Sequence, residues 1–409
     1  MSFDYTPFFR SDLAAPAGRW GGFPAYNFVG GHNDAESVPV DDLMASAAAV
    51  LAREGHTLAT YGLSSGPQGY RPLREGVAAQ LNARAGLACT ADDILITSGS
   101  LQALDLINAA LVEPGDTVIL EEACYSGAMS RLTKCGASYI GAPLDGDGIR
   151  IDALTAILED LKAKGVRPKF IYTIPTVQNP TGSVMPKARR EELLKVAAAY
   201  GVPIVEDDCY ADLIWDGDRP PAIRALPGGD RVIYCGSFSK SIAPALRVGY
   251  IVADWPVLSR LLPLKTDGGT GALEQMVLSE YLANGFDGHV TALTRTLQGK
   301  CAAMMEAVNQ HFGSAAEFTA PKGGIFLWVT LPDAVDTGSL FKAAGAEGVA
   351  INPGSEWSAD AASGRHRLRL CFAHPSVDSI REGVARLAEI CHREFGVPVR
   401  SANVQRGGS

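Results

Sequence analysis

The stretch RVIYCGSFSKSIAPALRVG, residues 231–249, decides how the rest of the sequence is interpreted. Its first part, RVIYCG, is short and apolar and predicts a buried strand. Ser237 and Ser239 follow, directly before Lys240, and Arg247 comes later in the same stretch. A lone lysine is most often a solvated surface charge, but hydroxyl groups and an arginine fork together suit a phosphate. A lysine at the end of a strand is also able to form an imine with a carbonyl cofactor, so this stretch predicts a cofactor site.

Working outward, we find polar residues at the ends of other predicted strands. A single polar residue after a strand is unremarkable, because strands end in turns. In an open α/β sheet, however, the carboxyl ends of parallel strands meet at one edge, where ligands bind. Together with Lys240, the residues therefore predict one site. Ser100 follows the predicted strand 93–97, Tyr125 follows 117–122 and Asn179 follows 169–175. Asp207 lies near the end of the predicted strand 202–208.

Strand-like and helical segments alternate from about residue 90. This alternation predicts an α/β fold with a mainly parallel sheet and helices on both faces. Near residue 285 the pattern changes, and a long helical stretch (287–312) precedes strand-like runs that are grouped together. We expect three parts: an N-terminal arm (1–40) packing on the active site and the small domain, a large cofactor-binding domain (41–285) and a small α+β domain (286–409).

The composition of the chain limits the kinds of molecule that it is expected to bind. The formal net charge is −9, which argues against a nucleic-acid surface or an anionic membrane. No run approaches the length of a membrane span, and the N-terminus has no apolar signal region. The sequence contains eight cysteines and no C-x-x-C pair, so we expect a reducing compartment, no metal site and a cytoplasmic protein.

Three motifs each allow two interpretations. SGSLQALDL (98–106) either caps a helix with small residues or exposes backbone N–H groups to a phosphate. No G-x-G-x-x-G follows a strand, which disfavours a dinucleotide. Asp207 in VEDDCY is either a turn former or a carboxylate that keeps a pyridine nitrogen protonated, as pyridoxal-phosphate chemistry requires. In the second interpretation Tyr210 donates to the 3-oxygen of the ring. Asn179 in QNPTG either begins a turn before Pro180 or hydrogen-bonds the same oxygen.

With these residues in place, the chain resembles the fold-type I pyridoxal-phosphate (PLP) enzymes, specifically class I/II aminotransferases. The branch it looks most like is that of the 2-aminoadipate and kynurenine aminotransferases. The resemblance covers roughly residues 25–395. Its matching stretches are QNPTG, EDDCY, GSFSK with ALRVG, PKGGIFLW, NPG and RLRLCFA. It implies a PLP enzyme of amino-acid metabolism that moves an amino group from an α-amino acid to a 2-oxo acid.

The resemblance also implies residue roles. Lys240 forms the Schiff base and moves the Cα proton, Asp207 pairs with the pyridine nitrogen, and Arg369 receives the substrate carboxylate. Tyr125 stacks on the ring. Tyr61 is similar to a tyrosine that reaches the phosphate of a neighbouring subunit, which implies a homodimer with shared sites. The residues expected to hold the 3-oxygen and the phosphate are Asn179, Tyr210, Ser100, Leu101, Ser237, Ser239 and Arg247.

The sequence departs from the family pattern in two places. Leu101, expected to act through its backbone N–H, stands where the family commonly has Gln. In the arm, GGHND (30–34) replaces the usual GG-Leu-Pro, so Gly31 and His32 are expected beside the substrate. The neighbouring Asn33 and Asp34 are also expected at the mouth of the site and hint at a polar substrate. His32 itself is either a hydrogen-bonded loop histidine or a proton donor or ligand-reading group.

Two other functions compete with transamination. The same scaffold supports PLP-dependent decarboxylation, elimination, replacement or O₂-dependent oxidation, because a fold does not decide the reaction. A DNA-binding regulator that carries this domain is the other alternative. We expect it less, because residues 1–60 are short and acidic for a winged-helix segment.

Overall fold

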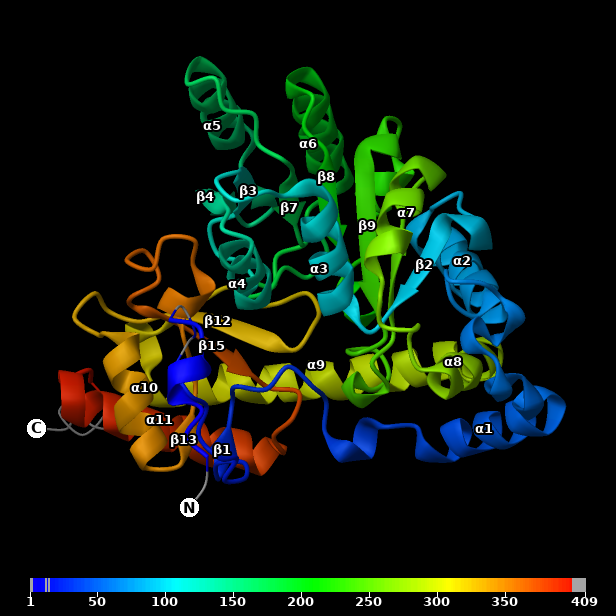
Figure 1. Ribbon diagram of the computed structural model, residues 1–409. Coiled ribbons are helices and arrows are strands. Elements are labelled where there is room, and N and C mark those ends of the chain that lie inside the picture. The colour runs from blue at the N-terminus through cyan, green and yellow to red at the C-terminus, as the bar shows by residue number, and fades with distance from the viewer. Residues whose placement is uncertain (1–2, 12, 14, 399–409) are drawn as a thin grey trace, which may run out of the picture.

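The computed structural model describes residues 3–11, 13 and 15–398. Its centre is a seven-stranded sheet in the order β2-β10-β9-β8-β7-β3-β4 (Figure 1). The strands are β2 (Ile94–Thr97), β3 (Thr117–Glu121), β4 (Ser138–Ala142), β7 (Ile171–Thr173), β8 (Ile204–Asp207), β9 (Val232–Ser237) and β10 (Gly249–Val252). The sheet confirms the predicted α/β class. The strand-like character of β4 and β10 was not identified from the sequence.

Strand direction places the candidate residues at one edge of this sheet. The strands β4, β3, β7, β8 and β9 pair in parallel, so their carboxyl ends lie together. β10 pairs antiparallel with both β9 and β2. Its beginning therefore lies at the edge where its neighbours end. For this reason Arg247, just before β10, comes to the same edge as Lys240, just after β9.

The strands are buried on both faces because their apolar residues alternate between two sets of helices. Leu95, Val118 and Val205 share one core with α3, α4 and α7. Their neighbours in the strands pack against α2 and α8 at one end of the sheet and against α5 and α6 at the other. The helices of this part are α1 (Val40–Glu54), α2 (Arg71–Ala85), α3 (Ser100–Leu111), α4 (Ser126–Lys134), α5 (Ile151–Ala163), α6 (Lys187–Tyr200), α7 (Trp255–Leu261) and α8 (Ala272–Asn284).

A second, antiparallel sheet lies in the C-terminal part. Its order is β11 (Glu317–Phe318), β12 (Phe326–Thr330), β15 (Arg367–Cys371) and β14 (Asn352–Pro353). It is accompanied by α9 (Phe286–His311), α10 (Thr337–Ala346) and α11 (Val377–Phe395). Figure 1 shows α9 running from α8 beneath the central sheet toward this small sheet. α9 begins at the expected domain boundary, and the three-part division itself stays a prediction.

The N-terminal arm crosses from α1 to the small sheet, as the blue segment in Figure 1 shows. β1 (Tyr26–Asn27) pairs in parallel with β13 (Val349–Ala350). The next residue, Phe28, is fully buried. A hairpin of β5 (Leu144–Asp145) and β6 (Gly148–Ile149) completes the strands. Among the described residues, no helix combines the length and the apolar character needed to cross a membrane.

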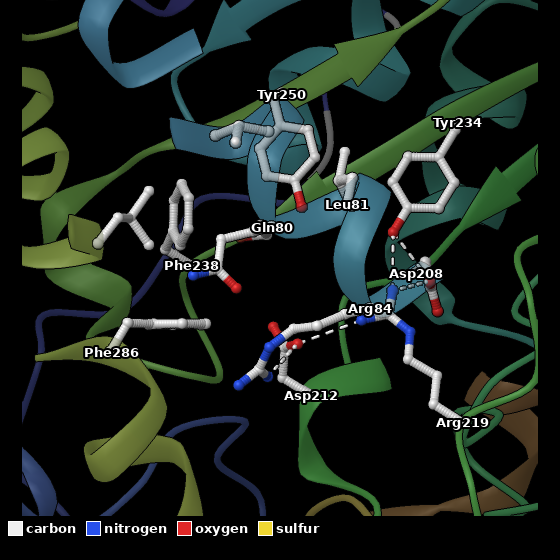
Figure 2. Close-up of a pocket in the computed structure, with 13 residues that line it drawn as sticks. Gln80, Leu81, Arg84, Asp208, Asp212, Arg219, Tyr234, Phe238, Tyr250 and Phe286 are labelled. Carbon is white, nitrogen blue, oxygen red and sulfur yellow. Dashed lines mark hydrogen bonds and ion pairs between the residues drawn. The ribbon is translucent and has the colours of Figure 1, made fainter. Parts of the chain in front are cut away.

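A partly buried ionic network joins the end of β8 to α2 (Figure 2). The Arg219 guanidinium lies 2.8 Å from Asp208 and 3.2 Å from Asp212. The Tyr234 hydroxyl also donates to Asp208, at 2.8 Å. Arg84 of α2 extends the network, since it contacts Asp212 at 3.2 Å. These carboxylates raise the pKa of Arg219 even though burial opposes that effect.

Removing the central cation should leave a buried carboxylate without its partner. We expect Arg219→Met to lower the free energy of unfolding by about 3–5 kcal/mol, because Asp208 then stays buried and uncompensated. Urea denaturation of the cofactor-bound protein measures this loss. Arg71→Met is the control, because Arg71 pairs with Glu75 at the exposed surface and should change stability little. An equal loss in the two variants would contradict this account.

Candidate active site

A cavity of about 410 Å³ opens at the carboxyl edge of the central sheet. This volume lies in the range of small-molecule sites. Every residue predicted to contact the cofactor or the substrate lines it except Tyr61. The predicted residues that line it are Gly31, His32, Ser100, Leu101, Tyr125, Asn179, Asp207, Tyr210, Ser237, Ser239, Lys240, Arg247 and Arg369.

Lys240 is held between the sheet and the N-terminal arm. Its amine donates a hydrogen bond to the carbonyl oxygen of Gly31, and its own carbonyl accepts one from the Asn33 side chain at 2.8 Å. Burial lowers the pKa of Lys240. A lowered pKa increases the fraction of neutral amine, which is the nucleophilic form.

Asp207, the last residue of β8, presents a buried carboxylate without a basic side chain hydrogen-bonded to it in the described part of the chain. The Tyr172 hydroxyl donates to one oxygen at 2.7 Å, and the Cys209 thiol donates to the other at 2.8 Å. Burial raises the pKa of Asp207, while the two hydrogen bonds oppose that rise. A cation placed beside this carboxylate would favour its charged form.

Asn179, Tyr210 and Arg369 form a hydrogen-bonded chain across the cavity. The Asn179 amide donates to the Tyr210 hydroxyl at 3.0 Å, and its oxygen accepts from Arg369 at 3.1 Å. All three side chains are buried. Asn179 therefore orients a hydroxyl and a guanidinium together, although they come from different elements.

Arg369 of β15 lies between two aromatic rings. Its guanidinium carbon is 3.4 Å from the ring centre of Trp357 and 3.7 Å from that of Phe326. The Nε atom is buried and has no hydrogen-bond partner among the described residues. Burial lowers the pKa of Arg369 to about 10, so the group stays charged at neutral pH. A fixed, partly unsatisfied guanidinium of this kind suits a carboxylate.

Donors for an anion gather at the N-terminus of α3, where Ser100 and Leu101 are the first residues of the helix. Free N–H groups at this position attract a phosphate. The Ser237 and Ser239 hydroxyls hydrogen-bond each other at 2.9 Å, and Arg247 donates to the carbonyl of Ser98 at 2.9 Å.

Two glycines permit this close assembly. A side chain at Gly99 would collide with the Arg247 guanidinium. A Cβ at Gly249 would lie 2.7 Å from the backbone nitrogen of Ser100. Arg247 itself has a φ of 53°, in the left-handed region, which indicates a backbone held by its surroundings.

Tyr125 follows β3 and immediately precedes α4. Its ring lies 5.9 Å from that of Trp357, between ring centres. Gly127 makes room for it, since a Cβ there would collide with the tyrosine ring. Tyr125 thus presents an aromatic surface to the cavity.

The arm residues 32–34 behave differently from one another. His32 lines the cavity as expected but forms no hydrogen bond among the described residues; its ring lies 4.6 Å from that of His374. Burial, then His374 and then Lys240 lower the pKa of His32. The expectation that Asn33 and Asp34 enter the mouth was wrong. Asn33 binds the backbone of Lys240, and Asp34 pairs with Lys300, because these polar side chains anchor the arm.

Tyr61 lies outside the cavity of this chain. Its side chain is 92% exposed and lines a separate hollow of about 890 Å³ together with Lys265 and Gly268. The structure of one chain therefore does not bring Tyr61 to the phosphate donors.

Several residues of the site were not identified from the sequence. Tyr172 had a usable signal, because a tyrosine in a fully buried strand requires a partner for its hydroxyl. Cys209 and Phe326 lie within motifs that were noted without a role for these side chains. Nothing in the sequence indicated a role for Trp357, which reaches Arg369 from the end of a short 3-10 helix (Gly354–Trp357).

The chemistry of these donors fits PLP. The partly buried amine of Lys240 suits the aldehyde, the buried carboxylate of Asp207 suits the pyridine nitrogen, and the helix terminus with its hydroxyls and Arg247 suits the phosphate. The amide of Asn179 and the hydroxyl of Tyr210 supply donors for the ring oxygen.

Comparisons with known proteins agree with this site. The family model of aminotransferase class I and II matches residues 29–387. Aromatic-amino-acid aminotransferase 1 of Thermococcus litoralis is 34% identical over 372 residues, 90% of this chain and 88% of that protein. The 2-aminoadipate transaminase of Thermus thermophilus is 36% identical over 366 residues, 88% of each chain. The crystal structure of a Pyrococcus horikoshii kynurenine aminotransferase superposes with a TM-score of 0.89 at 33% identity, covering 96% of this chain and 98% of that one.

The resemblance noted in the sequence is thereby confirmed, and the chain belongs to the class I and II aminotransferases, PLP-dependent enzymes of fold type I.

Proposed function

We propose that this aminotransferase works through Lys240, with an α-amino acid as donor and a 2-oxo acid as acceptor. The observation that carries this proposal is a partly buried amine in a cavity that also presents a buried carboxylate without a cation at Asp207 and a carboxylate receptor at Arg369. PLP supplies the electron sink when it is bound.

The chain's own residues divide the remaining work. Arg369 binds the substrate carboxylate and sets the position of Cα. Lys240, as a neutral amine, attaches the cofactor, is displaced by the substrate amine and then moves the proton at Cα. Asp207 holds the proton on the ring nitrogen. The residues that hold the ring and its phosphate are Asn179, Tyr210, Tyr125, Ser100, Leu101, Ser237, Ser239 and Arg247.

The names of the relatives guide the choice of substrates. They act, by name, on aromatic amino acids, 2-aminoadipate and kynurenine. We propose a substrate with a side chain larger than a methyl group, which the arm residues Gly31 and His32 contact. Apolar wall residues such as Val29 and Leu101 support this choice.

We further propose a homodimer with shared sites in the cytoplasm. The exposed ring of Tyr61 supports the first part, because a large aromatic side chain exposed at 92% suits contact with another copy. The free state of all eight cysteines supports a reducing compartment.

A panel of amino acids tests the reaction. A donor should change the absorbance of the bound cofactor and yield one keto acid per site, and a 2-oxo acid should restore the absorbance. Lys240→Ala should show neither the imine absorbance nor turnover, whereas Lys342→Ala, at an exposed position, should behave as wild type. Oxygen uptake, or release of CO₂ or ammonia over many turnovers without an acceptor, would indicate the alternative PLP chemistry.

Arg369→Gln should raise KM for the amino acid and lower kcat/KM by about 30- to 5,000-fold, since a buried charge pair with the substrate carboxylate is lost. Steady-state kinetics measure the effect, and the absorbance of bound cofactor checks that the site is intact. Arg365→Gln is the control. Arg365 lies just before β15, the strand of Arg369, but it is exposed and pairs with Asp336. Unchanged kinetics in Arg369→Gln would mean that the carboxylate binds elsewhere.

Subunit mixing tests whether sites are shared. Lys240→Ala and Tyr61→Ala chains should each be impaired alone. If Tyr61 acts in the neighbouring subunit, a mixed dimer has one intact site, and an equal mixture should recover roughly a quarter of wild-type activity. No recovery, with mixed dimers present by mass measurement, would mean that Tyr61 acts within its own chain or not at all.

A further inference from the structure

Glu121, the last residue of β3, carries a fully buried carboxylate that the mechanism does not use. It accepts hydrogen bonds from the Thr173 hydroxyl at 2.6 Å, from the Ile174 backbone N–H at 3.2 Å and from the Gln178 amide at 2.8 Å. All three donors are neutral. Burial raises the pKa of Glu121 to about 7, and these hydrogen bonds oppose the rise. A buried carboxylate without a cation lowers the stability of the fold. The hydrogen-bond partners of Glu121 indicate a role that explains its presence.

Those contacts lead to the loop that carries Asn179. The Gln178 amide nitrogen also donates to the carbonyl of Ala123 at 2.7 Å. Its oxygen accepts from both the backbone N–H and the hydroxyl of Thr181, each at 2.8 Å. Gln178 is therefore held at both ends of its side chain, and it directly precedes Asn179 in the chain.

We propose that Glu121 is a positioning residue that acts through Gln178 to aim Asn179 at Tyr210 and Arg369. This proposal rests on the roles proposed above for Asn179 and Arg369. Glu121 also links the two strand ends next to the cavity, because β3 leads into Tyr125 and β7 leads into Ile174, and both of these residues line the cavity.

The negative charge matters because of the orientation of the Gln178 amide. Glu121 accepts with both oxygens. In Glu121→Gln a single oxygen remains, so it cannot accept from both the Thr173 hydroxyl and the Gln178 NH₂ group. If the oxygen stays on Thr173, two NH₂ groups face each other and Gln178 has to turn away from Ala123 or Thr181; if it turns to Gln178, the Thr173 hydroxyl loses its acceptor.

The test compares Glu121→Gln with wild type in the cofactor-bound enzyme. We expect KM for the amino acid to rise about 10-fold or more, with a smaller change in kcat, because the aim of Arg369 changes. We also expect the pH at which the bound cofactor changes its absorbance to move upward by about half a unit or more. Without donation from Asn179, the ring oxygen holds the adjacent proton more firmly.

Glu206→Gln is the matched control. Glu206 is equally buried, on strand β8, which β7 separates from β3, and burial also raises its pKa to about 7. It accepts instead from the backbone N–H groups of Ile223 and Arg224, at 2.8 and 3.0 Å, and does not line the cavity. This variant should lose stability but keep KM and the absorbance midpoint within about twofold and a few tenths of a unit.

The exchange Glu121→Gln with Gln178→Glu restores one carboxylate–amide pair in reverse order, but it removes the donor to the Ala123 carbonyl, so it should recover part of the shift. It also keeps the test open if Glu121→Gln alone folds poorly. The proposal is overturned if Glu121→Gln leaves both KM and the midpoint unchanged, or if Glu206→Gln moves them equally. The proposed function itself is tested with the wild-type protein alone. It fails if that protein shows no cofactor absorbance or no transamination.

Discussion

Parallel strands end at the same edge of a sheet, and the whole site depends on this constraint. The five residues that follow or end β2, β3, β7, β8 and β9 would be unrelated in any other topology. The antiparallel β10 adds the last component, because its beginning lies where its neighbours end. Arg247 thereby reaches the N-terminus of α3, and the absence of a side chain at Gly99 leaves room for it.

Buried charges are treated in two ways in this molecule. Away from the cavity they have protein partners: Asp208 contacts Arg219 and accepts from Tyr234, and Glu121 accepts from three neutral donors. Inside the cavity the charged groups have fewer partners. Asp207 receives only a hydroxyl and a thiol, and the Nε atom of Arg369 has no partner among the described residues. In the scaffold the charged groups are satisfied by protein partners. In the cavity they keep free hydrogen-bonding positions, because a bound ligand supplies the missing partners.

The N-terminal arm shows that a local sequence motif does not predict the direction in which its side chains point. GGHND was expected to deliver three polar side chains to the mouth of the site, but only His32 lines the cavity. Asn33 and Asp34 instead fasten the arm to Lys240 and Lys300. The alternation of such side chains along an irregular segment depends on its backbone path, which sequence periodicity does not describe.

By itself, the sequence determined the fold class and predicted that Lys240, Asp207 and Asn179 lie at one edge of the sheet, because strand ends are marked by local composition and parallel topology then brings them together. The tertiary structure alone decided what surrounds them. Trp357 and Phe326 reach Arg369 from two other elements of the C-terminal part, and Glu121 of β3 reaches Gln178 in the loop after the adjacent strand β7. Contacts of this kind depend on how separate elements pack, so the residue pattern of a single helix or strand does not predict them.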